Sequence, residues 1–210
     1  MTVNVAMYQG PEGLGPEPDV ARNLAAIDGA AARAAESGAH LLVTPEMSAT
    51  GYDIGAEVAR LARPRGGEYH DALTAIASRH DLTVVGGYAE RDGDRVFNAA
   101  TVVAPDGTEL AHYRKTHLFG DLDRNAFAPG DELPVTFPLG GLTCGLLICY
   151  DVEFPENVRA HADAGTEVLL VPTALGHPSV VAEPVAGIVS AHTAMVSGCA
   201  ICRKPIAVPR

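Results

Sequence analysis

The start of the chain predicts a strand, a helix and a second strand, and this order constrains the fold more than any other feature. Val3 to Tyr8 is a short apolar stretch rich in β-branched residues, which is typical of strands. After a loop rich in glycine and proline, Asp19 can cap a helix whose apolar positions recur at helical spacing, namely Val20, Leu24, Ile27 and Ala31. Gly38 stands where a C-cap glycine belongs, and His40 to Val43 predicts a buried strand. Strands joined by a helix predict an α/β layered arrangement.

The middle of the chain adds strands that are joined by hairpins. Two turn sequences, Arg91-Asp92-Gly93-Asp94 and Pro105-Asp106-Gly107, separate three predicted strands: Leu82 to Tyr88, Val96 to Val103, and Glu109 to Tyr113. Further predicted elements are a helix over Tyr69 to Arg79, an apolar strand over Leu142 to Cys149, a helix over Pro155 to Ala164 and a strand over Glu167 to Val171. Helical and hairpin connections both occur, so the sheets should be mixed.

Length and charge limit the kind of protein. The 210 residues, 47% of them hydrophobic, suit one domain over 1–210, since chains divide only above about 250–300 residues. A formal net charge of −11 makes nucleic acid and acidic membrane surfaces poor partners. No run reaches the roughly 18 apolar residues of a membrane span, and the first residues lack the basic region of a signal peptide. We therefore expect a cytoplasmic protein.

The cysteines do not indicate a disulfide framework. Cys144, Cys149, Cys199 and Cys202 are too few and too unevenly spaced for a secreted disulfide-rich fold. Cys199 and Cys202 form a CxxC pair, but the chain offers no second pair that would complete a zinc site.

The first candidate functional residue is Glu46, which follows the apolar run Leu41 to Val43 and the ladder-ending Pro45. A carboxylate just beyond a buried strand is well placed to enter a cleft, where desolvation makes it a better general base. The alternative is a solvated loop glutamate.

The second candidate is Lys115, which follows Arg114 at the end of the second predicted hairpin. Side chains alternate across a strand, so one of these two cations can face the interior, where it needs a carboxylate or a developing anion. The alternative is an ordinary basic pair on an edge strand. His117 is a competing candidate for a base, although a lone loop histidine is more often structural.

The third candidate is Cys149, which closes an apolar strand and precedes a sharp change from strand to helix. This is the geometry of an exposed nucleophile with backbone N–H groups nearby to form an oxyanion hole. The alternative, a small buried hydrophobic residue, suits the mid-strand Cys144 better than Cys149, because a polar, acidic run follows Cys149 directly.

Together these segments resemble the nitrilase (carbon–nitrogen hydrolase) superfamily, whose Glu–Lys–Cys triad has the same chain order. The matching pieces are Thr44-Pro45-Glu46 with Gly51-Tyr52, Tyr113 to Leu118, Phe97 to Ala100, Cys149-Tyr150-Asp151 with Phe154-Pro155-Glu156, and Val171 to Ala174. The match covers roughly residues 3–178, and the segment 179–210 diverges from it.

The resemblance implies an α/β fold, a four-layer αββα sandwich with mixed sheets whose C-terminal part is incomplete in this chain. It implies Glu46 as general base, Lys115 as the cation that stabilises the oxyanion and Cys149 as the nucleophile, with the backbone N–H of Tyr150 sharing the oxyanion role. Many members place a further glutamate before a Pro-Gly loop, and here the matching residue is Asp123, one methylene shorter. Tyr52 and Thr173 are expected to line the substrate pocket.

The implied reaction is hydrolysis of a non-peptide C–N bond of a small amide or carbamoyl compound through a cysteine thioester. Side chains and amides meet all charges in this mechanism, so no metal or organic cofactor is expected. A nitrile is the alternative substrate. Because we expect an altered or truncated tail after about residue 178, a catalytically impaired binding module is the competing function, and a Cys–His enzyme using His117 is a third. The family resemblance also implies a homo-oligomer, a dimer or a multiple of dimers.

Overall fold

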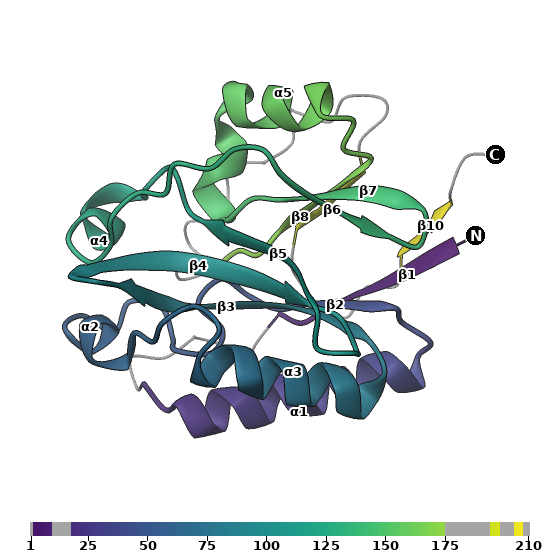
Figure 1. Cartoon of the computed structure of the whole chain (residues 1–210), viewed down its shortest axis with the longest axis horizontal. Coiled ribbons are helices and arrows are strands. Elements are labelled where there is room, and N and C mark those ends of the chain that lie inside the picture. Colours follow the sequence, from purple (N-terminus) through teal and green to yellow (C-terminus); the bar gives the residue numbers. More distant parts are fainter. Residues whose placement is uncertain (1, 10–17, 175–193, 198–203, 208–210) are drawn as a thin grey trace.

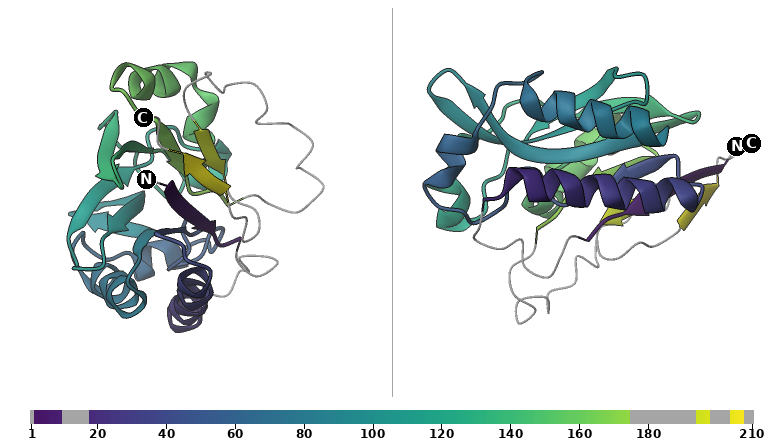
Figure 2. Two further views of the ribbon diagram at one scale, coloured as in Figure 1. Left: turned by 90° about the vertical axis from the view of Figure 1, so that its right-hand side faces the viewer. Right: turned by 90° about the horizontal axis from the view of Figure 1, so that it is seen from below.

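The computed structural model describes residues 2–9, 18–174, 194–197 and 204–207. Two sheets face each other, and helices cover the outer face of each (Figure 1). The helices are α1 (Val20–Glu36), α2 (Glu57–Leu61), α3 (Glu68–His80), α4 (Gly120–Arg124) and α5 (Pro155–Asp163), with the 3₁₀ helix η1 (Cys149–Glu153) before α5. In Figure 2, α1 and α3 lie side by side below the first sheet, on the opposite side of the molecule from α5.

The first sheet has the strand order β10-β1-β2-β3-β4-β5. Its strands are β1 (Thr2–Met7), β2 (Leu41–Val43), β3 (Thr83–Asp92), β4 (Arg95–Val103), β5 (Glu109–Arg114) and β10 (Lys204–Ala207). The strands β1, β2 and β3 pair in parallel, whereas β3, β4 and β5 pair as antiparallel hairpins. The predicted mixture of helical and hairpin connections is therefore confirmed for this sheet.

The second sheet has the order β6-β7-β8-β9, with β6 (Val135–Leu139), β7 (Leu142–Leu146), β8 (Val168–Val171) and β9 (Ala194–Ser197). The pair β6 and β7 is antiparallel, and β8 is parallel to both β7 and β9. Within the divergent segment 179–210, β9 thus pairs with the second sheet and β10 with the first. The CxxC pair Cys199 and Cys202 lies outside the described residues.

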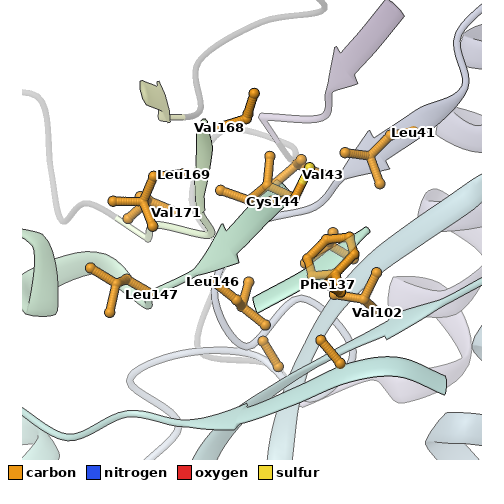
Figure 3. Close-up of a cluster of buried hydrophobic side chains, with 14 of the residues drawn as sticks. Leu41, Val43, Val102, Phe137, Cys144, Leu146, Leu147, Val168, Leu169 and Val171 are labelled. Carbon is orange, nitrogen blue, oxygen red and sulfur yellow. The ribbon is translucent and has the colours of Figure 1, made fainter. Parts of the chain in front are cut away.

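Side-chain alternation divides the interior into two apolar layers. Leu41 and Val43 of β2 point between the sheets, where they meet Phe137, Cys144 and residues of β8 (Figure 3). Leu42 points the other way and packs with Ile27 of α1 and other apolar side chains of α1 and α3. Cys144 is 2% exposed, and burial raises its pKa to about 12, so its predicted role as a core residue is confirmed. The four-layer αββα architecture implied by the resemblance is confirmed.

The local signals explain the elements that the sequence predicted. The Asp19 side chain accepts a hydrogen bond from the Arg22 N–H, as a helix N-cap should. Gly93 and Gly107 have φ of 57° and 86°, the left-handed conformation that tight turns require of one residue. The strand predicted to reach Cys149 ends its ladder with β6 at Leu146, although Leu147 and Cys149 still donate to the carbonyls of Leu170 and Pro172.

Candidate active site

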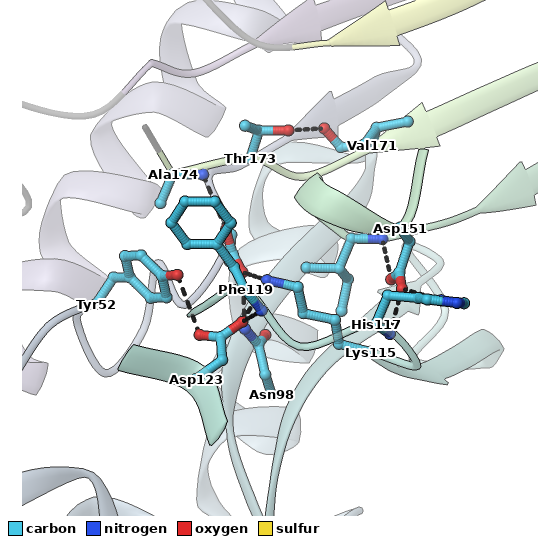
Figure 4. Close-up of polar contacts among 12 residues, drawn as sticks. Tyr52, Asn98, Lys115, His117, Phe119, Asp123, Asp151, Val171, Thr173 and Ala174 are labelled. Atoms are coloured by element: carbon cyan, nitrogen blue, oxygen red, sulfur yellow. Dashed lines mark hydrogen bonds and ion pairs between the residues drawn. The ribbon is translucent and has the colours of Figure 1, made fainter. Parts of the chain in front are cut away.

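The site forms where strands of both sheets end. Glu46 follows β2, Lys115 follows β5, and Cys149 and Ala174 follow β7 and β8. In Figure 4, the side chain of Lys115 lies beside that of Asp123. Within each sheet these strands run in the same direction, so their carboxyl ends share an edge. This edge is where open α/β sheets present functional groups.

Glu46 is 1% exposed, so the alternative of a solvated loop glutamate is wrong. Its Oε1 accepts hydrogen bonds from Lys115 Nζ and from Asn98 Nδ2, both at 2.7 Å. Its Oε2 accepts from the backbone N–H of Ala174 at 3.1 Å. The carboxylate is therefore buried with partners on both oxygens, which is the condition under which a buried charge is tolerated.

The backbone around Glu46 is fixed by its contacts with β3. The Thr44 hydroxyl donates to the Val85 carbonyl at 2.8 Å and lies 2.7 Å from the Ser48 hydroxyl. The loop passes so close to Gly87 that a Cβ there would lie 2.5 Å from the Met47 nitrogen. Glycine at this position is what allows the Glu46 loop to rest on the sheet.

Lys115 is also 1% exposed and bridges two carboxylates, because its Nζ lies 2.7 Å from Glu46 Oε1 and 2.7 Å from Asp123 Oδ2. Burial alone would lower the pKa of Lys115, but the charges of Glu46, Cys149 and Asp123 outweigh it and raise that pKa. Its neighbour Arg114 instead pairs with Glu90. The adjacent cations thus have separate partners, as strand alternation predicts, and Lys115 is not an edge-strand surface cation.

Cys149 occupies a strained turn, with φ of 47° in the left-handed region that non-glycine residues seldom adopt. Burial and the Glu46 carboxylate raise the pKa of its thiol, while Lys115 and a hydrogen bond from the Ala174 N–H act in the opposite direction. The thiol therefore sits among the groups that hold Glu46. Its proton is retained unless a neighbouring base accepts it.

Asp123 and Tyr52 complete the polar cluster. Asp123 is fully buried and accepts from the Tyr52 hydroxyl at 3.0 Å, in addition to its contact with Lys115. Burial, together with the negative charges of Glu46 and Asp123, raises the pKa of Tyr52, so this hydroxyl remains protonated. The Tyr52 ring borders a cavity of about 620 Å³, which is also lined by Ile54, Leu122 and Phe127.

The other two predicted site residues contribute less through their side chains. Tyr150 is the second residue of η1, and the first turn of a helix leaves N–H groups without intrahelical partners. Its ring packs edge-on against Phe119 and Phe154, with centroids 5.3 Å and 5.0 Å away. The Thr173 hydroxyl donates to the Val171 carbonyl at 3.0 Å, and it is the following residue, Ala174, whose amide contacts Glu46.

Asn98 was not predicted as a site residue, although it lies in the matching segment Phe97 to Ala100. The available signal was a polar amide within a strand whose neighbours are buried. Burying an amide is costly without a hydrogen bond, so such a residue calls for a buried partner. The partner is the carboxylate of Glu46.

Asp151 lies in the cysteine motif, and its role was not predicted from the sequence. Its Oδ2 accepts from the Ile148 N–H at 3.1 Å and from the Tyr113 hydroxyl at 3.0 Å. Its Oδ1 accepts from the N–H groups of Thr116 and His117 at 3.2 Å and 2.7 Å. One buried carboxylate therefore joins the turn that carries Cys149 to the segment that follows Lys115.

Within the described part of the chain, the His117 side chain has no hydrogen bond or ion pair with Glu46, Lys115 or Cys149, and its Nδ1 lies 3.4 Å from Asp151 Oδ1. Its ring stacks on Phe154 with centroids 3.7 Å apart, and its Nδ1 lies 3.1 Å from the Asn157 side-chain amide. These contacts are those of a structural histidine. In the part of the chain that the structure describes, no group of three or more histidine, cysteine, aspartate or glutamate side chains could hold a metal ion. In that same part, no helix is long and apolar enough to cross a membrane.

Comparison with known proteins agrees with the family resemblance that the sequence motifs indicate. A family model described as carbon-nitrogen hydrolase matches residues 4–204. A protein of Pseudomonas protegens named "Hydrolase in pqqF 5'region" is 46% identical over 177 residues, which cover 82% of this chain and 60% of that protein. An "(R)-stereoselective amidase" of a Pseudomonas species is 40% identical over 157 residues, covering 75% of this chain and 56% of the relative. The chain thus spans somewhat more than half the length of these relatives.

A solved amidase from a Nesterenkonia species superimposes with a TM-score of 0.74 at 35% identity, covering 84% of this chain and 66% of the amidase. One variant of that amidase carries acrylamide added at its active-site cysteine. Another carries the acetamide moiety of fluoroacetamide, bound covalently at the same cysteine. A further variant was solved in complex with butyramide.

Proposed function

The chain belongs to the carbon-nitrogen hydrolase family, and from this premise we propose that it hydrolyses the C–N bond of small amides through a thioester on Cys149. The observation that carries the proposal is the convergence of the buried Glu46 and Lys115 with the half-buried Cys149 in one cluster. Lys115 Nζ lies 2.7 Å from Glu46 Oε1, and the thiol interacts with both charges.

The charges of the cluster explain why a base is needed. With a neutral thiol, Glu46, Asp123 and Lys115 together carry a net charge of about −1, and loss of the thiol proton to solvent would add a second buried negative charge. Transfer of that proton from Cys149 to Glu46 leaves the net charge unchanged. The base therefore lowers the cost of forming the thiolate.

The proposed acylation conserves every proton. Glu46 takes the proton from the Cys149 thiol, and the sulfur forms a bond to the carbonyl carbon of the amide. Lys115 and the backbone N–H of Tyr150 stabilise the resulting oxyanion. Glu46 then returns the proton to the nitrogen, the C–N bond breaks, and ammonia leaves a thioester behind.

Deacylation uses the same groups. Water attacks the thioester carbon, Glu46 accepts its proton, and the tetrahedral intermediate collapses with cleavage of the C–S bond. Glu46 then protonates the sulfur, and a carboxylic acid is released.

Small amides are proposed in preference to nitriles because the relative and the solved neighbour just described are named amidases. Tyr52 borders the cavity where the rest of the substrate is proposed to lie.

The test is ammonia release from a panel of small amides, carbamoyl compounds and nitriles, with Cys149→Ala as the matched control. The expected result is release from amides by the wild type and none by the variant, together with a mass increase on Cys149 when acrylamide or fluoroacetamide is added. Release from nitriles alone would identify a nitrilase. Binding of amides without turnover or adduct would favour the binding module.

We further propose that residues 1–210 form one domain that assembles as a dimer or a multiple of dimers. Backbone pairing of β9 with β8 and of β10 with β1 supports the single domain, because it joins the segment after residue 178 to both sheets. Light scattering of the purified chain tests the assembly. A monomer at micromolar concentration would contradict it.

A further inference from the structure

The two oxygens of Glu46 have different surroundings. Oε1 accepts from Lys115 Nζ and from Asn98 Nδ2, while Oε2 accepts only from the Ala174 N–H among the described residues. The segment that carries this amide lies beside the Cys149 turn, because the Cys149 N–H donates to the carbonyl of Pro172 at 2.9 Å. Because Oε2 bonds to Ala174 in the segment that pairs with Cys149, Oε2 is the oxygen directed toward the Cys149 turn.

We propose that Asn98 is a positioning residue that holds Oε1 away from the reaction and directs Oε2 to the Cys149 proton. This inference rests on the proposed function. Rotation of a glutamate carboxylate about its last torsion is soft, so its direction depends on its hydrogen-bond partners. Lys115 alone does not fix that direction, since its ammonium is shared with Asp123. The neutral Asn98 amide adds direction without adding charge.

The unused half of the Asn98 amide supports a functional role over a stabilising one. Asn98 is fully buried, and within the described part of the chain its Oδ1 has no hydrogen-bond partner. A rotated amide would place Oδ1 against the Glu46 carboxylate, so the contact with Glu46 fixes the orientation and leaves Oδ1 unsatisfied. A buried amide oxygen without a hydrogen-bond partner lowers stability. Exceptions to the rule that buried polar atoms are hydrogen-bonded concentrate at functional sites.

Asn98→Asp gives a test with a signature that a purely structural role would not produce. A protonated Asp at this position can still donate to Oε1, whereas an ionised one cannot donate and repels Glu46. Two carboxyl groups in contact share one proton over a wide pH range, and burial extends that range upward. The titratable groups that face the pair are Lys115, Asp123, Cys149 and Tyr52.

The expected result is that kcat/KM of Asn98→Asp falls about tenfold or more between roughly pH 6 and pH 8, as the shared proton is lost, while the wild type shows no such fall. Asn98→Leu should lower kcat about tenfold to a hundredfold at every pH, with KM changed less than about threefold. Thr101→Val is the matched control, because Thr101 is a buried polar residue of the same strand on the opposite face. Its pH profile should match that of the wild type.

Alkylation of Cys149 by iodoacetamide, followed by mass spectrometry across the same pH range, separates failure of this inference from failure of the proposed function. A wild type that alkylates at Cys149 but hydrolyses no amide would refute the function alone, and the altered alkylation profile of Asn98→Asp would still support the positioning role. The inference is overturned if Asn98→Asp, folded by circular dichroism, keeps the wild-type profile in both assays. It is also overturned if Asn98→Leu retains wild-type kcat.

Discussion

Replacing Gly87 by alanine is expected to displace the Glu46 carboxylate while the rest of the fold remains in place. A Cβ at Gly87 would lie 2.5 Å from the Met47 nitrogen, 3.0 Å from the Pro45 carbonyl oxygen and 3.2 Å from the Glu46 carbonyl carbon. All three are backbone atoms, so rotation of a side chain cannot relieve the contact. The loop must move outward by about 1 Å to restore ordinary van der Waals separation.

The magnitude follows from this shift. A misplacement of about 1 Å at a reacting group costs on the order of a hundredfold in rate, so kcat/KM of Gly87→Ala should fall by about that factor. Overpacking a buried position costs about 1–3 kcal/mol, which corresponds to a decrease in Tm of roughly 2–12 °C for a chain of this size. The variant should therefore remain folded at 25 °C and be nearly inactive.

Gly86→Ala is the matched control, because Gly86 is the adjacent residue of β3 and faces the other way. A Cβ there would meet Leu73 Cδ1 at 2.5 Å and Cδ2 at 2.7 Å, which are side-chain atoms of α3 on the face opposite the site. Gly86→Ala should lower Tm by a similar amount and leave kcat/KM within about threefold of the wild type. Amide hydrolysis and thermal unfolding of both variants are measured together. Equal losses of activity in the two, or full activity in Gly87→Ala, would refute the reasoning.

Three further predictions follow from buried groups. Asp151→Asn places an amide that also donates where the carboxylate only accepts, so some of its hydrogen bonds are lost. The Cys149 turn should then shift, and kcat/KM should fall about tenfold to a hundredfold in the amide assay. Unchanged activity would show that the link between this turn and the segment after Lys115 is dispensable. Burial lowers the pKa of His161 to about 4. Between about pH 6.5 and pH 4 the unfolded chain therefore binds a proton that the folded chain does not, so the free energy of unfolding is highest above about pH 6.5 and falls as the pH drops toward 4. Denaturant unfolding should show this fall in the free energy of unfolding as about 3 kcal/mol for the wild type and as less for His161→Gln. Equal falls in the two proteins would contradict the prediction. Of the two described cysteines, Cys149 should alkylate increasingly toward alkaline pH and Cys144 should not react in the folded state, as peptide mass spectrometry would reveal; modification of Cys144 first would contradict the packing.

The fold was predictable where the sequence carries local signals. The helix capped by Asp19 and the turns at Gly93 and Gly107 depend on residues close in sequence, so pattern and capping identify them. The short elements α2, α4 and β6 were not predicted. The helices α2 and α4 have five residues each and no side-chain cap, and β6 contains Pro138, which ordinarily argues against a strand. These elements are stabilised by packing against the rest of the fold more than by their own sequences.

The candidate site also contains residues that local sequence signals predict and residues that they do not. Glu46, Lys115 and Cys149 could be singled out because each is a polar residue at the end of an apolar segment. The roles of Asn98 and Asp151 depend on partners 52 and 34 or more residues away, such as Glu46 and His117, and no local pattern specifies such partners. Thr173 illustrates the same limit, since its neighbour Ala174 contacts Glu46 through a backbone amide that any residue supplies.

Both oxygens of the Asp123 carboxylate have hydrogen-bond partners. Oδ2 accepts from Lys115 Nζ and from the Phe119 N–H at 2.9 Å, while Oδ1 accepts from the Tyr52 hydroxyl. The bond from Phe119, the residue just before α4, draws the loop toward the carboxylate, so the one-turn helix brings the aspartate to the lysine. Lys115 thus lies between two buried carboxylates at equal distances of 2.7 Å. This symmetry keeps the ammonium charged and fixed, which is what an oxyanion-stabilising cation requires before substrate arrives.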